Sequence, residues 1–281
     1  MKNRKMRFCL VFVVIGIIFF VLVLFAESKG VEASSNDLRL WYKAPAQEWT
    51  EALPVGNGRL GGMIFGGVEK EHIQFNEDSL WTGIPRDYSN PQANEYLSEI
   101  RWLLLEGKQR EAERLGMQKF MSIPLRQERY QPFGDVWIEF DGSPEFSDYR
   151  RELDLDRAVA TVKYKKGDVT FTRSVFVSYP DQVMVIHLAV DKPKQLNFIL
   201  SVTSPHRETQ ITIHKDMIVL NGRVSDYTNR HEKALRPSIL KFESWLKVHL
   251  NDGNLVKDGN KLHVTQASEV TVILTGATSY I

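Results

Sequence analysis

Residues 51–83 read EALPVGNGRLGGMIFGGVEKEHIQFNEDSLWTG, and the rest of the chain is organised around this stretch. Its seven glycines mark places where the backbone takes a positive φ or where another segment approaches closely. The apolar run 61–68, bounded by glycines, predicts a buried strand. The alternating residues 72–76 predict the strand that returns beside it. We therefore expect an antiparallel hairpin with a polar and aromatic cluster at residues 76–81.

Beyond this hairpin, short strand patterns dominate the sequence. Residues 196–203 alternate apolar and polar side chains, which is the period of a half-buried strand. One region differs, because apolar residues recur at helical spacing after Asn90-Pro91, a pair that suits a helix start. A weaker helical pattern continues to Phe120. The sequence therefore predicts an all-β, antiparallel β-sandwich or supersandwich with a small helical insertion at about residues 90–121.

The first 33 residues predict an export signal. Basic residues precede an apolar run over residues 8–26, and Val31-Glu32-Ala33 offers a small-residue cleavage site. We expect cleavage after Ala33, which leaves residues 34–281 as one extracellular β-sandwich domain. The alternative is an uncleaved N-terminal anchor at the cell surface, because the run approaches the length of a membrane-spanning helix. Membrane contact would then involve residues 8–26 only.

Composition argues against several classes of function. A net charge of +1 does not favour a nucleic-acid partner, which needs a concentrated basic face. The single cysteine, Cys9, lies inside the signal, so no thiol nucleophile or disulfide is expected in the exported part. The histidines lack metal-site spacing, and we expect no metal and no cofactor. Gly56-x-Gly58-x-x-Gly61 matches a dinucleotide-binding pattern, but a strand rather than a helix follows it.

Carboxylates are the remaining candidates for catalysis, since glycoside hydrolysis uses two of them across a sugar. The candidates are Glu77-Asp78, Asp135, Glu48 and Glu51, and the sequence does not show that any two converge. Each is better explained as a solvated or turn-capping group. Trp81 suits either stacking on a sugar or packing in the core. From the residues alone, we expect a secreted β-sandwich without a self-sufficient catalytic set.

Several longer motifs follow one another in order. They are Ala52-Leu53-Pro54-x-Gly56-Asn57-Gly58-Arg59-Leu60-Gly61, Gln74-x-Asn76-Glu77-Asp78-x-Leu80-Trp81-x-Gly83, Tyr130-Gln131-Pro132-x-Gly134-Asp135 and Ser178-Tyr179-Pro180-Asp181-Gln182-Val183. With these motifs the chain resembles the start of glycoside hydrolase family 95, the α-L-fucosidases that include 1,2-α-L-fucosidase. The resemblance covers essentially all of residues 34–281.

The resemblance implies that this region is the N-terminal β-sandwich domain of such an enzyme. In that family a helical linker and an (α/α)6 barrel follow, and the barrel carries the catalytic residues of an inverting mechanism. We therefore expect a chain that is truncated before the barrel, inactive by itself, and without catalytic residues of its own. The expected function is that of the non-catalytic N-terminal domain of a secreted α-L-fucosidase-like enzyme, which acts on fucosylated glycans through the barrel.

The resemblance also points to a candidate surface. We expect it to dock onto the barrel or to contact the sugar, and its residues are Asn57, Arg59, Asn76, Glu77, Asp78 and Trp81. A purely structural set of turns is the alternative. For the whole chain, the alternatives are a stand-alone carbohydrate-binding module and an inactive remnant.

Overall fold

A computed structural model describes residues 38–229 and 234–281. The predicted signal or anchor, residues 1–33, lies outside the described residues. Residues 40–281 form one structural unit, built mainly from antiparallel strands. This confirms the prediction of an all-β fold with a small helical insertion. In the described part of the chain, no helix combines the length and the apolar character needed to cross a membrane.

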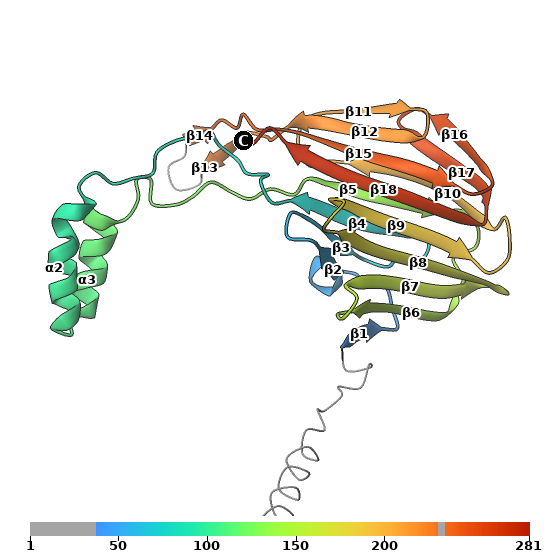
Figure 1. Ribbon diagram of the computed structural model, residues 1–281, viewed down its shortest axis with the longest axis horizontal. Helices are drawn as coiled ribbons and strands as arrows, with labels where there is room; N and C mark the ends of the chain where they lie inside the picture. The colour runs from blue at the N-terminus through green and yellow to red at the C-terminus, as the bar shows by residue number, and fades with distance from the viewer. Residues whose placement is uncertain (1–37, 230–233) are drawn as a thin grey trace, which may run out of the picture. The chain divides into compact units, whose positions relative to one another are not determined.

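Two large sheets form the sandwich (Figure 1). In spatial order, the nine-stranded sheet consists of β1 (Arg39–Tyr42), β6 (Ser147–Asp154), β7 (Val159–Lys166), β8 (Val169–Ser178), β9 (Val183–Val190), β18 (Glu269–Thr278), β15 (Lys241–Leu250), β12 (Met217–Arg223) and β11 (Glu208–His214). The seven-stranded sheet consists of β16 (Asn254–Asp258), β17 (Lys261–Ala267), β10 (Leu196–Thr203), β5 (Gly134–Phe140), β4 (Lys70–Glu77), β3 (Leu60–Ile64) and β2 (Leu53–Gly56). A short hairpin of β13 (Tyr227–Asn229) and β14 (Ala234–Arg236) stands apart from both sheets.

The core lies between the sheets because alternate residues of each strand point inward. On β4, Ile73 and Phe75 are fully buried. On β9, Ile186 and Leu188 are buried in the same cluster. The half-buried period predicted for residues 196–203 is confirmed, because the side chains at 196, 198, 200 and 202 all belong to this core.

The predicted hairpin is present and is larger than expected. β3 pairs with β4, with Gly61 opposite Asn76, and β2 adds a third strand outside β3. β3 ends at Ile64 rather than near residue 68. The reason is a tight turn, in which Gly66 has a φ of 79° and a Cβ on Gly67 would lie 1.9 Å from the Lys70 carbonyl oxygen. The glycines there are therefore required by close backbone approach.

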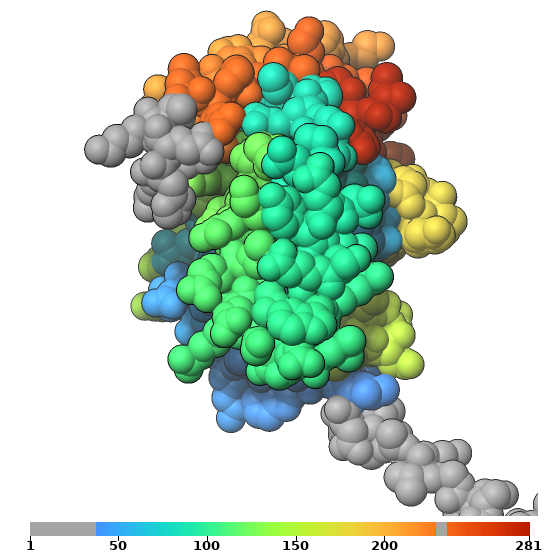
Figure 2. Space-filling view, turned by 90° about the vertical axis from the view of Figure 1, so that its left-hand side faces the viewer, coloured from blue at the N-terminus to red at the C-terminus, as the bar shows by residue number. Residues whose placement is uncertain are grey.

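The helical insertion contains α2 (Ala93–Leu105), α3 (Gln109–Leu115) and the π-helical turn η2 (Gly116–Phe120). A short 3-10 helix, η1 (Trp49–Glu51), precedes β2. α2 and α3 lie side by side (Figures 1 and 2). The N-cap of α2 is Gln92 rather than Asn90, because Asn90 instead closes a turn by accepting a hydrogen bond from the Gln92 N–H. Gly107, with a φ of 73°, follows the C-terminal end of α2, a position where glycine commonly ends a helix.

The segments that lead to and from the helices run side by side next to the sandwich. Trp81 and Tyr130 form an antiparallel bridge. The Thr82 N–H donates to the Arg129 carbonyl oxygen, and the Gln131 N–H donates to that of Leu80. These backbone bonds hold residues 80–82 and 129–131 in fixed register.

His206, in the loop between β10 and β11, is a buried histidine with a defined protonation state. It is 4% exposed, and its ring packs against Phe242 at a centroid distance of 5.2 Å. Its Nδ1 accepts a hydrogen bond of 3.1 Å from the Ser225 N–H, so the neutral ring carries its proton on Nε2. Burial lowers the pKa of His206 below its ordinary value.

We expect the free energy of unfolding to fall as the pH is lowered from 7.5 to 5.5. The unfolded chain binds a proton at His206 near the ordinary pKa of about 6.5, whereas the folded chain resists protonation. The contribution is therefore present above that pKa and is lost, by about 1 kcal/mol, as the pH falls below it. Urea unfolding at both pH values measures it. His206→Asn keeps an acceptor for Ser225 without a titrating ring, so its stability should change less. Equal pH dependence in both proteins would contradict the assignment.

Candidate functional site

The polar residues of the stretch 51–83 gather at one end of the sandwich. The β2–β3 turn, the C-terminal end of β4 and the C-terminal end of β18 meet there. Arg59 in the turn donates to the Gly276 carbonyl oxygen of β18 at 2.8 Å. Ser79, just after β4, shares a 2.5 Å hydrogen bond with Thr278 of β18. The candidate surface therefore joins the two sheets.

Asn57 organises the β2–β3 turn. Its Oδ1 accepts hydrogen bonds from the N–H groups of Arg59 and Leu60, at 3.0 and 2.8 Å. Its Nδ2 donates to the Ser178 carbonyl oxygen at 2.8 Å, next to the β8–β9 turn. Gly58, with a φ of 93°, supplies the left-handed residue that the turn needs. The side chain of Asn57 is thus occupied within the chain.

Arg59 and Glu77 form the centre of this network. The Arg59 Nε donates to the Gln182 Oε1 at 2.6 Å, and its Nη1 lies 3.4 Å from the Glu77 Oε1. The Glu77 side chain is 6% exposed, and its Oε2 accepts from the N–H and the hydroxyl of Ser79. Arg59 therefore balances a nearly buried carboxylate and ties it to the nine-stranded sheet. Both residues have structural partners that account for their charges.

Asn76 has a comparable role on β4. Its Oδ1 accepts a 2.7 Å hydrogen bond from the Phe133 N–H, at the point where the chain returns from the helical insertion. This bond fixes the start of β5 against β4.

Asp78, Trp81 and the neighbouring Tyr130 are the part of the cluster that faces solvent. Trp81 is 39% exposed and Tyr130 is 44% exposed, and their ring centroids are 5.4 Å apart. The Trp81 Nε1 donates to the Asp78 carbonyl oxygen and the Tyr130 hydroxyl donates to that of Glu77, so both rings are held in place. The Asp78 carboxylate receives no hydrogen bond from the residues that the structure describes. Partial burial raises the pKa of Tyr130, which keeps its hydroxyl protonated. Two fixed rings beside a carboxylate suit a ligand with apolar faces and hydroxyl groups.

The other candidate carboxylates do not join this cluster. Asp135 lies on the outer face of the seven-stranded sheet opposite Gln74, whereas Glu77 faces inward. The Asp135 Oδ1 lies 2.6 Å from the His72 Nε2. Glu51 accepts hydrogen bonds from the N–H groups of Gln47 and Glu48, which lowers the pKa of its carboxyl. Because Asp135 and Glu77 point to opposite faces of one sheet, they do not form a hydrolytic pair.

A cluster around Glu128 was not foreseen from the sequence. Its Oε1 accepts from Arg86 at 3.0 Å, and its Oε2 accepts from the Tyr227 hydroxyl at 2.5 Å. Tyr88 donates a longer bond to the same carboxylate. Glu128 therefore joins the segments on either side of the helical insertion to the β13–β14 hairpin. No local sequence pattern predicts such a residue, because its partners come from two distant segments, the loop with Arg86 and Tyr88 and strand β13.

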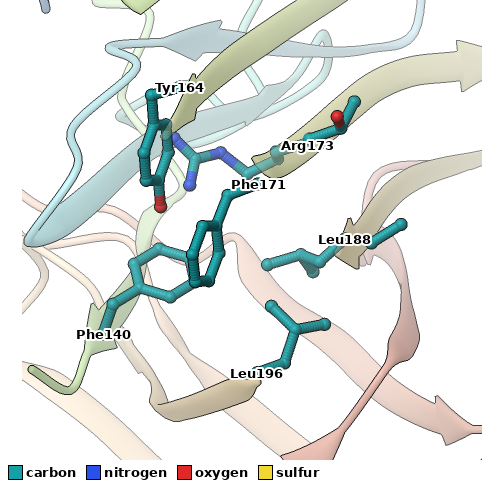
Figure 3. A pocket seen from close by; sticks show the side chains of 8 residues that line it. Phe140, Tyr164, Phe171, Arg173, Leu188 and Leu196 are labelled. Carbon is teal, nitrogen blue, oxygen red and sulfur yellow. The ribbon is translucent and has the colours of Figure 1, made fainter. Parts of the chain in front are cut away.

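Cavities and metal ligands do not suggest another site. One small cavity lies inside the sandwich between Phe140, Phe171, Leu188 and Arg173 (Figure 3). Its interior volume of about 10 Å³ is far below the roughly 300–1,000 Å³ of ordinary small-molecule sites. Among residues 38–229 and 234–281, no three His, Cys, Asp or Glu side chains gather closely enough to hold a metal ion. The solvent-facing end of the sandwich remains the candidate site.

Comparison with known protein families adds the context for this end of the sandwich. Residues 40–281 match the model of the family described as glycosyl hydrolase family 65, N-terminal domain. The chain belongs to this family. The match covers all the strands of the sandwich from Leu40 onward, together with the candidate site and the helical insertion. The expectation of a glycoside hydrolase N-terminal domain is therefore confirmed.

Three curated relatives bear the name of α-fucosidases. The chain is 37% identical over 264 residues to Alpha-L-fucosidase 2 of Arabidopsis thaliana, which covers 88% of this chain and 31% of the relative. It is 33% identical over 198 residues to "Probable alpha-fucosidase A" of Aspergillus niger, which covers 66% of this chain and 24% of the relative. It is 33% identical over 182 residues to the protein of the same name from Aspergillus oryzae, and this match covers 59% of this chain and 23% of the relative. The chain thus spans about a third or less of the length of these relatives.

The structure brings Asn57, Arg59, Asn76, Glu77, Asp78 and Trp81 to the same end of the domain. Asn57, Arg59, Asn76 and Glu77 are held by hydrogen bonds within the chain, and Asp78 and Trp81 face solvent. Docking onto a second domain and contact with sugar both stay predictions. Tyr130 is the addition to the candidate set, and its place in the motif Tyr130-Gln131-Pro132 was the available signal.

Proposed function

We propose that this chain acts as the non-catalytic N-terminal domain of a secreted α-L-fucosidase-like hydrolase of glycoside hydrolase family 95, whose substrates are fucosylated glycans. The observation that carries the proposal is the combination of α-fucosidase relatives with a candidate site whose buried carboxylate already has partners. The Glu77 carboxylate accepts hydrogen bonds from Arg59 and Ser79. Asp78 therefore has no second free carboxylate beside it. Inverting hydrolysis needs two such groups. In this proposal the catalytic groups lie in the (α/α)6 barrel that the resemblance to family 95 implies.

In this proposal the exposed end of the sandwich contacts the barrel near its sugar pocket. Asp78, Trp81 and Tyr130 form the contact, and Arg59 and Glu77 hold it in shape from behind. Export through residues 1–33 places the enzyme where glycans are displayed, either released or anchored at the cell surface. The proposal includes no cofactor and no nucleic-acid partner.

The 281-residue chain should not hydrolyse a fucosyl substrate by itself. The assay is the release of fucose from 2′-fucosyllactose by the purified chain at high protein concentration. We expect no turnover above a buffer control, because the candidate carboxylates Glu77 and Asp135 point to opposite faces of one sheet. Turnover by the purified chain, at a rate proportional to its concentration, would show that the sandwich carries its own catalytic groups and would refute the proposal.

A chimera tests the positive half of the proposal. Residues 38–281 replace the matching segment of the Arabidopsis relative, which keeps its own remaining two-thirds. We expect this chimera to release fucose and Trp81→Ala to reduce the rate by about tenfold or more, because an indole at the centre of a contact contributes strongly. The matched control is Trp49→Ala, which removes an indole that is 53% exposed elsewhere. If the Trp81→Ala and Trp49→Ala chimeras released fucose at the same rate, Trp81 would not contribute to the contact.

A stand-alone carbohydrate-binding module is the second candidate, favoured by the fixed and exposed pair Trp81 and Tyr130. Calorimetry of the 281-residue chain with 2′-fucosyllactose and with lactose tests it. Binding of 2′-fucosyllactose that Trp81→Ala abolishes would support the module. If no heat of binding were measured at millimolar ligand, the chain would not be a carbohydrate-binding module.

A further inference from the structure

A second polar-aromatic surface lies far from the candidate site in sequence, on the outer face of the nine-stranded sheet. Trp245 is on β15, between β12 and β18. Its neighbours Ser244 and Leu246 are buried and face the core, so Trp245 points outward. The indole is 47% exposed although its strand is central in the sheet. A large exposed aromatic side chain at such a position calls for an explanation.

The indole of Trp245 is held in one orientation. Its Nε1 donates a 2.7 Å hydrogen bond to the Glu243 Oε1, two residues away on the same face. Val219, its cross-strand partner on β12, is only 8% exposed. The indole is thus fixed at its polar edge, and binding costs less when a contact group is already ordered.

An apolar strip runs obliquely from Trp245 across the neighbouring strands. The residue directly opposite Trp245 on β18 is Thr275, and Ile273 lies diagonal to Trp245 and opposite Lys247. Ile273 of β18 pairs with Val185 of β9, which in turn pairs with Phe176 of β8. Ile273 and Phe176 are both exposed. From β15 to β8 there are three strand spacings of about 4.8 Å each, so the strip is roughly 14 Å long. This length exceeds that of a single side-chain contact and suits an extended ligand.

Hydrogen-bonding side chains lie next to each half of the strip. Gln210, Asn221 and Glu243 face one another across β11, β12 and β15, beside Trp245. Thr271, His187 and Ser174 face one another across β18, β9 and β8, beside Ile273, Val185 and Phe176. The surface therefore offers an oblique apolar strip with a polar row beside each of its two halves.

This pattern matches the chemistry of a saccharide. A pyranose has apolar ring faces and hydroxyl groups at its edge, so its faces suit the strip and its hydroxyls suit the polar rows. A protein partner is less suitable, because the centres of protein interfaces are depleted of charged residues, and both Glu243 and Lys247 lie next to Trp245. We propose that the outer face of the nine-stranded sheet, centred on Trp245, binds a neutral oligosaccharide or polysaccharide chain.

This second surface is separate from the exposed end formed by Asp78, Trp81 and Tyr130. It would bind a longer glycan at sugar units remote from the glycosidic bond that the proposed enzyme cleaves. It needs neither the barrel nor fucose, so it can be tested on the chain as it stands. If the hydrolase proposal is wrong, the proposal for the Trp245 surface still stands. If the Trp245 surface binds no saccharide, the hydrolase proposal still stands.

Affinity gel electrophoresis of the 281-residue chain tests the proposal. Native gels contain either hydroxyethylcellulose or galactan as neutral polysaccharide probes, and a gel without polysaccharide is the reference. We expect at least one probe to slow the wild-type chain. Trp245→Ala should weaken that interaction by about tenfold, which corresponds to roughly 1.4 kcal/mol. The matched control is Trp102→Ala, which removes an indole of similar exposure (51%) from α2 and should migrate like wild type.

Circular dichroism and thermal unfolding of each variant establish that the fold is retained, and Trp245→Phe should keep much of the interaction because it keeps an aromatic face. The proposal is overturned if neither probe slows the wild-type chain, or if Trp245→Ala and Trp102→Ala are slowed equally. Sedimentation velocity gives the other contrary outcome. A wild-type dimer that Trp245→Ala converts into a monomer, without any retardation by polysaccharide, would assign the face to a second copy of the chain.

Discussion

Replacement of Arg173 by methionine should lower the free energy of unfolding by about 3–5 kcal/mol. Arg173 on β8 is 2% exposed and forms an ion pair with Glu71 of β4, which is fully buried. The Arg173 Nη2 also donates to the Gly67 carbonyl oxygen at 2.9 Å. The variant leaves a carboxylate inside the sandwich without its cation. The loss is large because a charge without a partner is costly in the protein interior.

The pH dependence of this loss follows from Glu71. Burial raises the pKa of its carboxyl, while Arg173 and the N–H groups of Gly66 and His72 oppose the rise. Removal of Arg173 takes away the strongest opposing effect, so the pKa rises further in the folded variant. A folded state that holds a proton loses stability as the pH rises above the ordinary pKa of about 4.3. Arg173→Met should therefore be weakened more at pH 8 than at pH 5.

Chemical unfolding at the two pH values measures both effects. The control is the double variant Glu71→Gln/Arg173→Met, which removes both charges and should regain part of the lost stability. Double-mutant analysis then separates the coupling from the two single changes. If Arg173→Met unfolded like the wild type at pH 8, the pair would contribute nothing to the fold.

Part of this arrangement was available from the sequence. The alternation in residues 72–76 predicts a strand, and extending it by one residue places Glu71 on the same face as Ile73 and Phe75, so a buried carboxylate could have been inferred there. Its partner could not, because Arg173 belongs to the other sheet and the pairing depends on how the sheets stack. β2 escaped prediction since it has four residues and contains Pro54. β6 escaped because Arg151, at a buried position between Tyr149 and Leu153, interrupts the apolar period.

The candidate site shows the same limit. Local turn chemistry explains why Asn57 and Gly58 occur together. The partners of Arg59 are Gln182, in the β8–β9 turn, and Gly276, on β18. Both are distant in sequence and are defined only by the fold. Sequence motifs therefore identified residues that the structure brings together, and left open which of them hold the domain together.

Arg59→Ala should separate these roles, with an expected loss of about 2–4 kcal/mol in the free energy of unfolding. The guanidinium donates to Gln182 and to Gly276 and pairs with Glu77, whose side chain is 6% exposed. Its loss leaves the Glu77 carboxylate nearly buried without a cation and detaches the β2–β3 turn from β18. Exposure of the Arg59 side chain (31%) places the effect below that of Arg173→Met.

Asp78→Ala is the matched comparison, because Asp78 is next to Glu77 in sequence and faces solvent. We expect its effect on stability to stay within about 0.5 kcal/mol, as for most surface positions. In the chimera with the Arabidopsis relative, activity is measured well below the unfolding temperature. There, Asp78→Ala should reduce fucose release more than Arg59→Ala does. Arg59→Lys, which keeps the charge but not the planar set of donors, should recover only part of the stability. If Asp78→Ala destabilised the chain as much as Arg59→Ala, the exposed end of the sandwich would be structural throughout, and the contact proposed for it would lose its basis.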